Sequence, residues 1–368
     1  MQNNRRLSAC AAGNPSVIPW MLDMASAISI VIPVYNGAAC LDACLQAIRR
    51  LRPAPLECIV VDDGSTDNSA SIARQACVTV VSLPDRQGPA TARNLGARAA
   101  LGEILLFLDA DVLVSPDALN RVAARFAAFP KCDAVIGSYD SYPASPDLIS
   151  QYRNLLHCYT HQSGKERTCL FWTGCGAIRT SVFRSLGGFE ETRRGPSMED
   201  VELGMRVRRA GGEIWLDKQL QVKHLKHLNI AGMVRTDIWD RAIPWTRLIL
   251  RWHEMPADLN LKWAQRFSVL ASAWGTLAIP LALLPGALPT GPLLLSSLLA
   301  ALLIIVLNRG FYRFLAMVRS PWLCLRAFPF HCLYFLCCGA GFAAGFAMHH
   351  YMLWTGKSAE PDTVSQET

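Results

Sequence analysis

The chain has 368 residues, long enough for about two domains, with 51% hydrophobic residues and a formal net charge of +7. This charge is too small and too scattered to indicate a nucleic-acid partner, and the bases gather around apolar stretches, which favours contact with anionic lipid. The 13 Cys show no paired CxxC spacing, so the sequence supports neither a zinc site nor a redox motif, and we expect a reducing compartment.

Residues 1–26 are expected to form a loose N-terminal extension. They carry charge but no apolar core of signal-peptide length, and Met21 and Met24 are alternative start sites.

From Ile28 onward, short apolar strands alternate with helical segments. Strands are expected at residues 28–36, 56–63, 78–83 and 103–111, and helices at 41–51, 67–76 and 88–100. The strands are continuous apolar runs, which is typical of a parallel sheet covered on both faces. Strand–helix alternation of this kind predicts an open α/β sheet whose ligand lies beyond the carboxyl ends of the strands.

Three polar clusters follow three of these strands, and in this topology they meet at one edge of the sheet. They are Tyr35-Asn36, the segment 62–65 and the segment 109–111. Asp109 and Asp111 end the buried run ILLFL, and two carboxylates at a strand end suit a divalent cation that carries a diphosphate. A plain polar turn at the end of each strand is the alternative.

The residue types at this edge match the needs of a nucleotide diphosphate. Tyr35 can stack on a base, Asp62 and Asp63 can accept hydrogen bonds from base and ribose, and Asp109 can also reach the ribose. Arg93, one turn into the helix that starts at Pro89, is expected to contact a phosphate, although a solvated helix residue is the alternative.

A further helix is predicted between Ser197, as N-cap, and Gly211 or Gly212. Glu199 and Asp200 lie in its first turn. Asp200 is either a general base for an acceptor hydroxyl or only part of a capping arrangement with Ser197. The small-residue loop 173–176 suits a close approach of backbone to a ligand.

Together these stretches resemble glycosyltransferase family 2, inverting enzymes with the GT-A fold. The matching text is IVIPVYNG, VVDDGSTDNS, GPATARNLGARAALGEILLFLDAD, FWTGCGAIRTSVFRSLGGFEE and the Glu199-Asp200 pair followed by VELGMRVRRAGGEI. The resemblance implies a UDP- or GDP-linked sugar donor, a Mg²⁺ or Mn²⁺ ion and a mixed, mainly parallel sheet over residues 27–228.

Site residues follow from the same resemblance, position by position. Asp200 becomes the catalytic base, with Glu199 beside it, and Asp109 and Asp111 form a DxD-type motif in which Asp111 is the expected metal ligand. The expected donor-binding residues are Pro33, Tyr35, Asp62, Asp63, Arg93, Asp109 and Ala110. The expected acceptor-side residues are Trp172, Gly174 and Cys175.

Two positions qualify the resemblance. The QxxRW motif of processive synthases is missing from DIWDRAIPWTRLILRW, which favours a single transfer over polymerisation. His224 or His227 could add a third metal ligand, although a lone His is more often structural.

The last third of the chain holds three apolar runs long enough to cross a membrane, at residues 267–288, 290–307 and 328–354. Bases precede the first run and separate the second from the third, whereas the loop LPTGP has none. The positive-inside rule then predicts a multi-pass protein of the cell (inner) membrane, with the catalytic domain in the cytoplasm and the polar tail 355–368 across the membrane.

Residues 229–265 form an amphipathic juxtamembrane segment before the transmembrane part, 266–354. Its Trp and Arg residues indicate helices lying on the cytoplasmic leaflet, and a plain stop-transfer flank is the alternative.

These observations predict a membrane-bound glycosyltransferase that acts on a lipid or lipid-linked acceptor. Within this class a polyprenyl phosphate and a glycolipid-type hydroxyl both remain open, and a hydroxyl is mildly favoured because it needs a base. Outside it, the chain could be an inactive nucleotide-sugar-binding scaffold. A nucleotidyltransferase is disfavoured because VYNGAACLD is not a glycine-rich basic loop.

Overall fold

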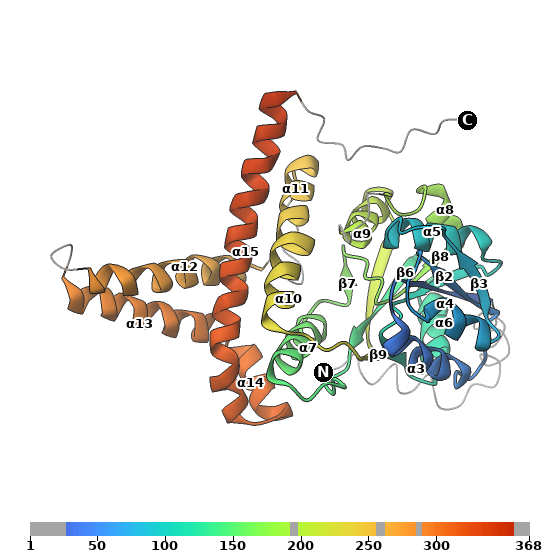
Figure 1. Cartoon of the computed structure of the whole chain (residues 1–368), viewed down its shortest axis with the longest axis horizontal. Helices are drawn as coiled ribbons and strands as arrows, with labels where there is room; N and C mark the ends of the chain where they lie inside the picture. The colour runs from blue at the N-terminus through green and yellow to red at the C-terminus, as the bar shows by residue number, and fades with distance from the viewer. Residues whose placement is uncertain (1–26, 192–197, 255–261, 285–288, 357–368) are drawn as a thin grey trace.

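The computed structural model describes residues 27–191, 198–254, 262–284 and 289–356. The predicted N-terminal extension, Ser197 and most of the polar tail lie outside these residues. Within them, an α/β domain is followed by a group of long helices that lies on one side of it (Figure 1).

One mixed sheet forms the centre of the α/β domain, in the order β3-β2-β1-β4-β8-β6-β9-β5, with β7 paired to β9. The first four strands of this order are parallel, and β8 then runs antiparallel to β4 and β6. The strands are β1 (Ile28–Val34), β2 (Glu57–Asp62), β3 (Thr79–Ser82), β4 (Ile104–Leu108), β5 (Val112–Val114), β6 (Cys132–Tyr139), β7 (Arg167–Thr168), β8 (Cys175–Arg179) and β9 (Glu213–His224). The predicted fold class, a mainly parallel sheet of mixed direction, is confirmed.

Helices cover both faces of the sheet, which explains why its strands are continuous apolar runs. In β1, Ile30 and Ile32 face one core and Val31 faces the other, because alternate strand residues point to opposite faces. The first face carries α3 (Ala38–Arg49), α4 (Ser69–Gln75) and α6 (Ala118–Ala128). The second carries α5 (Pro89–Ala99), α8 (Thr180–Ser185) and α9 (Glu199–Arg209).

The start of α9 differs from its prediction. The helix begins at Glu199, and its N-cap residue is Met198 in the left-handed conformation (φ 63°), with no capping side chain. Asp200 lies in the first turn of this helix, and the predicted capping arrangement with Ser197 falls outside the described residues.

The three predicted apolar helices are present, and each is long and apolar enough to cross a membrane. They are α12 (Trp263–Leu283), α13 (Thr290–Leu307) and α15 (Pro321–Thr355). The third begins seven residues before the predicted run. The Arg-rich segment before it, predicted as a loop, contains another helix, α14 (Arg309–Val318), because its apolar residues recur at helical spacing.

The described part of the juxtamembrane segment is helical, as expected, and it packs against α15. It consists of α10 (Ile230–Arg235), a π-helical turn η1 (Thr236–Ala242) and α11 (Ile243–Trp252). Figure 1 shows α11 between α15 and α9. On another side, α7 (Leu148–Gln162) shares a hydrophobic cluster with α10, α14 and α15. The α/β domain and the C-terminal helices are thus packed together at two places.

Candidate functional site

A cavity of about 670 Å³ opens at the carboxyl ends of β1 and β4. Its lining includes Tyr35 and Arg86, called here the outer end, the acids after β4 and the start of α9. It also includes Met233, Thr236 and Trp245 of the juxtamembrane helices, called here the inner end. Of the predicted site residues, the lining includes Pro33, Tyr35, Asp63, Arg93, Asp109, Ala110, Asp111, Trp172, Glu199, Asp200 and His224. The polar clusters that follow β1, β2 and β4 therefore contribute to one cavity.

The outer end of the cavity presents an aromatic ring beside a cation. Tyr35 is 40% exposed, and the guanidinium carbon of Arg86 lies 4.4 Å from the centre of its ring. Both oxygens of Asp63 accept backbone N–H groups, from Gln87 and Gly88, and so fix the loop that carries Arg86.

Asp62 differs from its neighbour. Its carboxylate accepts the backbone N–H of Ser65, and it is absent from the cavity lining. Of the two predicted Asp residues at the end of β2, the structure brings only Asp63 to the cavity.

Arg93 lies between two carboxylates and does not point free into the cavity. Its Nη2 donates to Asp109 at 2.8 Å, and its Nη1 donates to Glu199 at 2.8 Å. Arg93 thus forms two ion pairs, with the buried Glu199 and the partly exposed Asp109, and its contact with a phosphate stays a prediction. Because α5 carries Arg93 and α9 carries Glu199, these ion pairs tie the DxD-type loop to the start of α9.

Asp111 and His224 are neighbours in the lining of the cavity. His224 Nε2 lies 3.5 Å from Asp111 Oδ2, because β9 pairs with β5 in a register that sets Val112 opposite His224. Burial raises the pKa of Asp111, but the contacts with His224 and Lys226 outweigh it, so the pKa lies below its usual range. His227 instead contacts Asp147 at 3.0 Å, so His224 is the one of the two predicted histidines that approaches the acids.

The donor set fits a divalent ion of the expected kind. Two ligand atoms that each lie about 2.1 Å from an octahedral ion, with a ligand–ion–ligand angle of about 90°, are about 3 Å apart. The 3.5 Å between His224 Nε2 and Asp111 Oδ2 is close to this separation. Among the residues that the structure describes, no three His, Cys, Asp or Glu side chains form a metal-binding group. Such a pair would therefore need substrate oxygens to complete the coordination, as is usual for ions that carry nucleotide phosphates.

Asp200 lies at the middle of the cavity, in the first turn of α9. Its Oδ2 accepts the N–H and hydroxyl of Thr173, both at 3.4 Å, and its Oδ1 accepts the N–H of Val201 at 2.8 Å. Burial and the neighbouring Glu199 raise the pKa of Asp200 to about 6, against the opposing effect of Arg93. A carboxylate with a pKa close to neutral is suited to take up a proton.

The predicted acceptor-side residues separate into two layers. Trp172 lines the cavity, with its ring 4.9 Å from that of Tyr139 and 5.0 Å from that of His161. Gly174 lies behind the Trp172 indole, and Cys175 is buried inside β8; neither is part of the cavity lining. Their small size lets the indole and the strands pack closely, which is a structural reason for the small-residue loop.

Sequence reasoning missed a cationic group at the inner end of the cavity. Arg153 forms a buried ion pair with Asp237, and Arg241 donates to Nε2 of His157 at 2.6 Å. Burial and the proximity of Arg153 lower the pKa of Arg241, and burial and Arg241 hold the pKa of His157 well below its usual value. These residues come from α7 and η1, which carry no recognisable motif, so only the tertiary structure brings them together.

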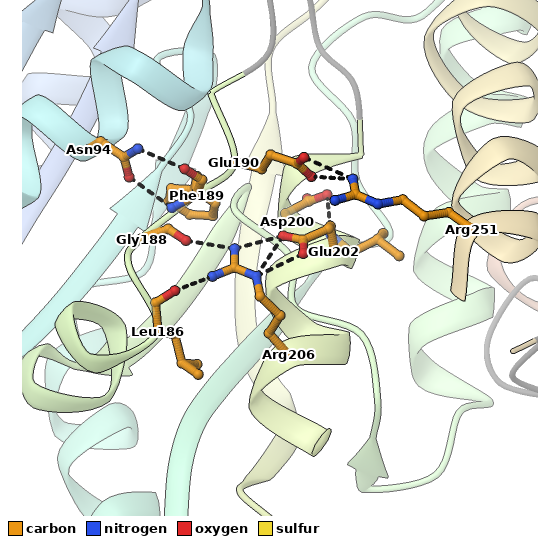
Figure 2. A network of polar contacts seen from close by, with 10 residues as sticks. Asn94, Leu186, Gly188, Phe189, Glu190, Asp200, Glu202, Arg206 and Arg251 are labelled. Carbon is orange, nitrogen blue, oxygen red and sulfur yellow. Dashed lines mark hydrogen bonds and ion pairs between the residues drawn. The ribbon is translucent and has the colours of Figure 1, made fainter. Parts of the chain in front are cut away.

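A polar network fixes α9 relative to the rest of the domain (Figure 2). Arg206 binds Glu202 one turn earlier and donates to the carbonyl oxygens of Leu186 and Gly188. The Asn94 side chain exchanges two hydrogen bonds with the backbone of Phe189. The loop 186–189 therefore connects α5, which carries Arg93, with α9, which carries Asp200.

Comparison with known proteins finds sequence similarity over the part of the chain that forms the sheet. Residues 29–187 match the model of glycosyl transferase family 2. The chain is 31% identical over 218 residues to the validoxylamine A glucosyltransferase of Streptomyces hygroscopicus subsp. limoneus, covering 50% of this chain and 48% of that protein. It is 28% identical over 214 residues to the pre-mycofactocin glycosyltransferase of Mycobacterium tuberculosis, covering 54% of this chain and 42% of that protein. The chain thus spans about half the length, or less, of these curated relatives.

A solved structure extends the likeness to most of the chain. The mannosyltransferase PcManGT from Pyrobaculum calidifontis, solved with GDP-Man and Mn²⁺, aligns with 86% of this chain and 86% of its own, with a TM-score of 0.52 and 19% identity. At this identity the likeness concerns the fold. Residues 29–187 are therefore similar to glycosyl transferase family 2, and the chain has a fold like that of this mannosyltransferase.

Proposed function

We propose that the protein transfers a sugar from a UDP- or GDP-linked donor to a hydroxyl group of a lipid or lipid-linked acceptor, with inversion at the anomeric carbon. The observation that carries the proposal is that a single cavity joins the acids after β4, Asp200 and the juxtamembrane helices. Donor and acceptor can thus enter from opposite ends and meet at Asp200.

The outer half of the cavity supports the donor assignment. Tyr35 offers a face for the base, and Asp63 and Asp109 offer acceptors for base and ribose hydrogens. A Mg²⁺ or Mn²⁺ ion held by Asp111 and His224 would neutralise charge on the diphosphate as the nucleotide leaves. The mannosyltransferase of similar fold was solved with GDP-Man and Mn²⁺, which supports this class of donor and ion.

Asp200 takes the proton of the acceptor hydroxyl. The two hydrogen bonds from Thr173 hold one of its oxygens, and the start of α9 holds it in the cavity wall. Its raised pKa makes it a better proton acceptor than an ordinary surface carboxylate. Glu199 acts indirectly, because it positions Arg93 and raises the pKa of Asp200.

The inner half of the cavity supports a membrane-derived acceptor. It is lined by Met233, Thr236 and Trp245, whose helices pack against the apolar helix α15. Lys262 lies just before α12, Arg266 lies in its first turn, and Arg309 and Arg313 follow α13. By the positive-inside rule, this distribution supports a cytoplasmic catalytic domain.

A phosphate acceptor, such as a polyprenyl phosphate, is a second candidate. Arg153 and Arg241 line the inner end of the cavity and could contact a phosphate there, although Arg153 pairs with the buried Asp237 and Asp240 also lines this end. A phosphate is already ionised and scarcely needs a base, so the two acceptors differ in their demand on Asp200.

The test incubates membranes that contain the protein with labelled UDP- and GDP-sugars and identifies the labelled lipid by mass spectrometry. Wild-type protein should form a labelled lipid, and Asp111→Ala should not. Loss of transfer in Asp200→Asn indicates a hydroxyl acceptor, whereas retained transfer to a lipid phosphate indicates the second candidate. Donor binding without transfer to any lipid would contradict both and favour a scaffold protein.

A further inference from the structure

We propose that only α12 and α13 cross the bilayer and that α15 lies along its surface on the side of the catalytic domain. This inference concerns the lipid-facing surface of the molecule and does not depend on which donor or acceptor the cavity takes. It assigns a membrane-surface role to a helix whose length and composition alone would suit a third span.

The N-terminal end of α15 is attached to the α/β domain. Arg319, just before the helix, donates to the carbonyl oxygen of Ser141 at 2.8 Å and to the side chain of Gln151 at 3.1 Å. Ala327, in the second turn, packs with Tyr152 of α7 in one hydrophobic cluster.

The middle and the C-terminal half of α15 are attached to the same domain through η1 and α11. Gly341 meets Ala242, and a Cβ at Gly345 would lie only 2.9 Å from that of Thr246, so the helices are in close backbone contact. On its other side, α11 places Leu248 in a cluster with Leu170, Val201 and Met205 of the catalytic domain.

A charged contact reinforces this second attachment. Arg251 at the end of α11 donates to Glu190 at 2.8 Å, and Figure 2 shows this pair beside the Arg206 network. With 35 residues, α15 is about 50 Å long. Both ends of α15 are attached to a domain with many surface charges. If α15 crossed the hydrocarbon layer, part of that charged domain would have to enter the layer as well.

The α12–α13 hairpin is arranged differently. Near its base, Ala271, Ala300 and Ile304 form a cluster with Phe335 in the middle of α15. Towards its tip, Ala278, Ala282 and Leu293 form a separate cluster that includes no residue of α15. In Figure 1 the hairpin points away from α15, on the side opposite to the catalytic domain.

The hairpin also has the dimensions and composition of a membrane-spanning unit. Its helices have 21 and 18 residues, or about 32 and 27 Å, close to the thickness of the hydrocarbon layer. The sequence has no charged residue between Phe267 and Leu307.

The exposed face of α15 points toward the same side as the hairpin. Phe335 and Gly339 contact the hairpin, and Phe342, Phe346 and Leu353 follow them at the spacing of one helix face. Phe342, Phe346 and Leu353 are exposed, whereas Gly341 and Gly345 lie on an adjacent face of the helix, against η1 and α11. The exposed Trp322, Tyr351 and Trp354 are residue types typical of a membrane interface, and Arg266, Arg309 and Arg326 suit anionic headgroups.

The topology can be tested with the full chain expressed in Escherichia coli. Green fluorescent protein and alkaline phosphatase are fused in turn after Thr368 and inserted within residues 285–288. The C-terminal fusions should fluoresce and lack phosphatase activity, and the insertions between α12 and α13 should show the reverse. An active phosphatase at the C-terminus would overturn the proposal, as would fluorescence at both positions.

A matched pair of variants tests the same point without a reporter at the end of α15. Leu298→Lys puts a charge in the middle of α13 and should greatly reduce the amount of protein that resists carbonate extraction from membranes. Phe342→Lys puts the same charge in the middle of α15 and should leave that amount unchanged, because a lysine at the interface remains hydrated. An equal loss in both variants would show that α15 is embedded like α13. Neither readout depends on sugar transfer, so failure of this proposal and failure of the proposed function are distinguishable.

Discussion

The α/β domain and the C-terminal helices use similar apolar sequences in opposite ways. All five residues of β4, ILLFL, are buried between two layers of helices. In α13, an equally apolar sequence leaves Leu295, Leu298 and Leu299 more than half exposed. A continuous apolar run thus indicates a segment that avoids water. Only the structure shows whether protein or lipid covers that segment.

Charges follow the same division. Beside the buried strands, the α/β domain holds Arg93, Asp109 and Glu199 in a network of ion pairs at the cavity. In α12 and α13 there is no charged side chain after Arg266. Charged side chains are therefore concentrated at the site where chemistry is proposed. Substitution of single residues measures how much each contributes to activity or stability.

The largest effect is expected at the proposed base. Asp200→Asn keeps the shape of the side chain but replaces one acceptor oxygen with an NH2 group and removes the basicity, so kcat should fall by about 10²- to 10⁴-fold. The measurement is single-turnover transfer from the nucleotide sugar to the identified lipid. Asp42→Asn, at the surface of α3 where Asp42 pairs with Gln46, is the control and should retain activity. A wild-type rate in Asp200→Asn with a hydroxyl acceptor would contradict the role of base.

Removal of the central cation should give the largest loss of stability. Arg93→Met leaves the buried Glu199 and the partly exposed Asp109 without their partner, and breaking a buried pair such as Arg93–Glu199 costs about 3–5 kcal/mol of unfolding free energy. Thermal unfolding of the detergent-solubilised protein would show it as a large fall in the midpoint. Arg98→Met, on the same helix, is the matched control. The Arg98 side chain is 63% exposed and its nearest Glu191 oxygen is 3.8 Å away, and exposed pairs contribute about 0–1 kcal/mol. Equal midpoints for the two variants would show that the Arg93 network is not structural.

The expected metal pair should respond next. His224→Ala removes the imidazole that faces Asp111 and should weaken Mn²⁺ binding by about tenfold or more, which electron paramagnetic resonance of free Mn²⁺ can measure. His227→Ala is the control, because His227 is paired with Asp147 instead. Unchanged Mn²⁺ affinity in His224→Ala would leave Asp111 as the expected ligand and remove His224 from the site.

A smaller effect is expected from pH. Asp200, with a pKa of about 6, must be ionised to accept a proton, so kcat/KM should be constant above about pH 7 and should fall as the pH drops below 6. The slope should approach one tenfold loss per pH unit, because one proton blocks one base. A profile that is flat down to pH 5 would indicate an acceptor that arrives already ionised.

The sequence predicted the parts of this site that lie along single strands and helices. Tyr35, Asp63 and Asp111 follow strands whose apolar runs are unmistakable, and parallel pairing brings strand ends together. It did not predict which charges pair: Arg93 was expected to meet a phosphate, and in the structure it pairs with Glu199, more than a hundred residues away. It also missed Arg153 and Arg241, because the packing of α7 against η1 depends on side-chain fit and not on a repeating pattern.

The smallest effect is expected at the contact between the two regions. Arg251→Ala breaks the pair with Glu190, in which the side chains are 49% and 33% exposed, and such pairs contribute about 0–1 kcal/mol. The unfolding midpoint should therefore hardly change, while the apolar cluster around Leu248 keeps α11 in place. Leu248→Ala removes that buried side chain and should cost about 2–5 kcal/mol. If Arg251→Ala were the more damaging of the two, charge and not apolar packing would join the catalytic domain to the membrane helices.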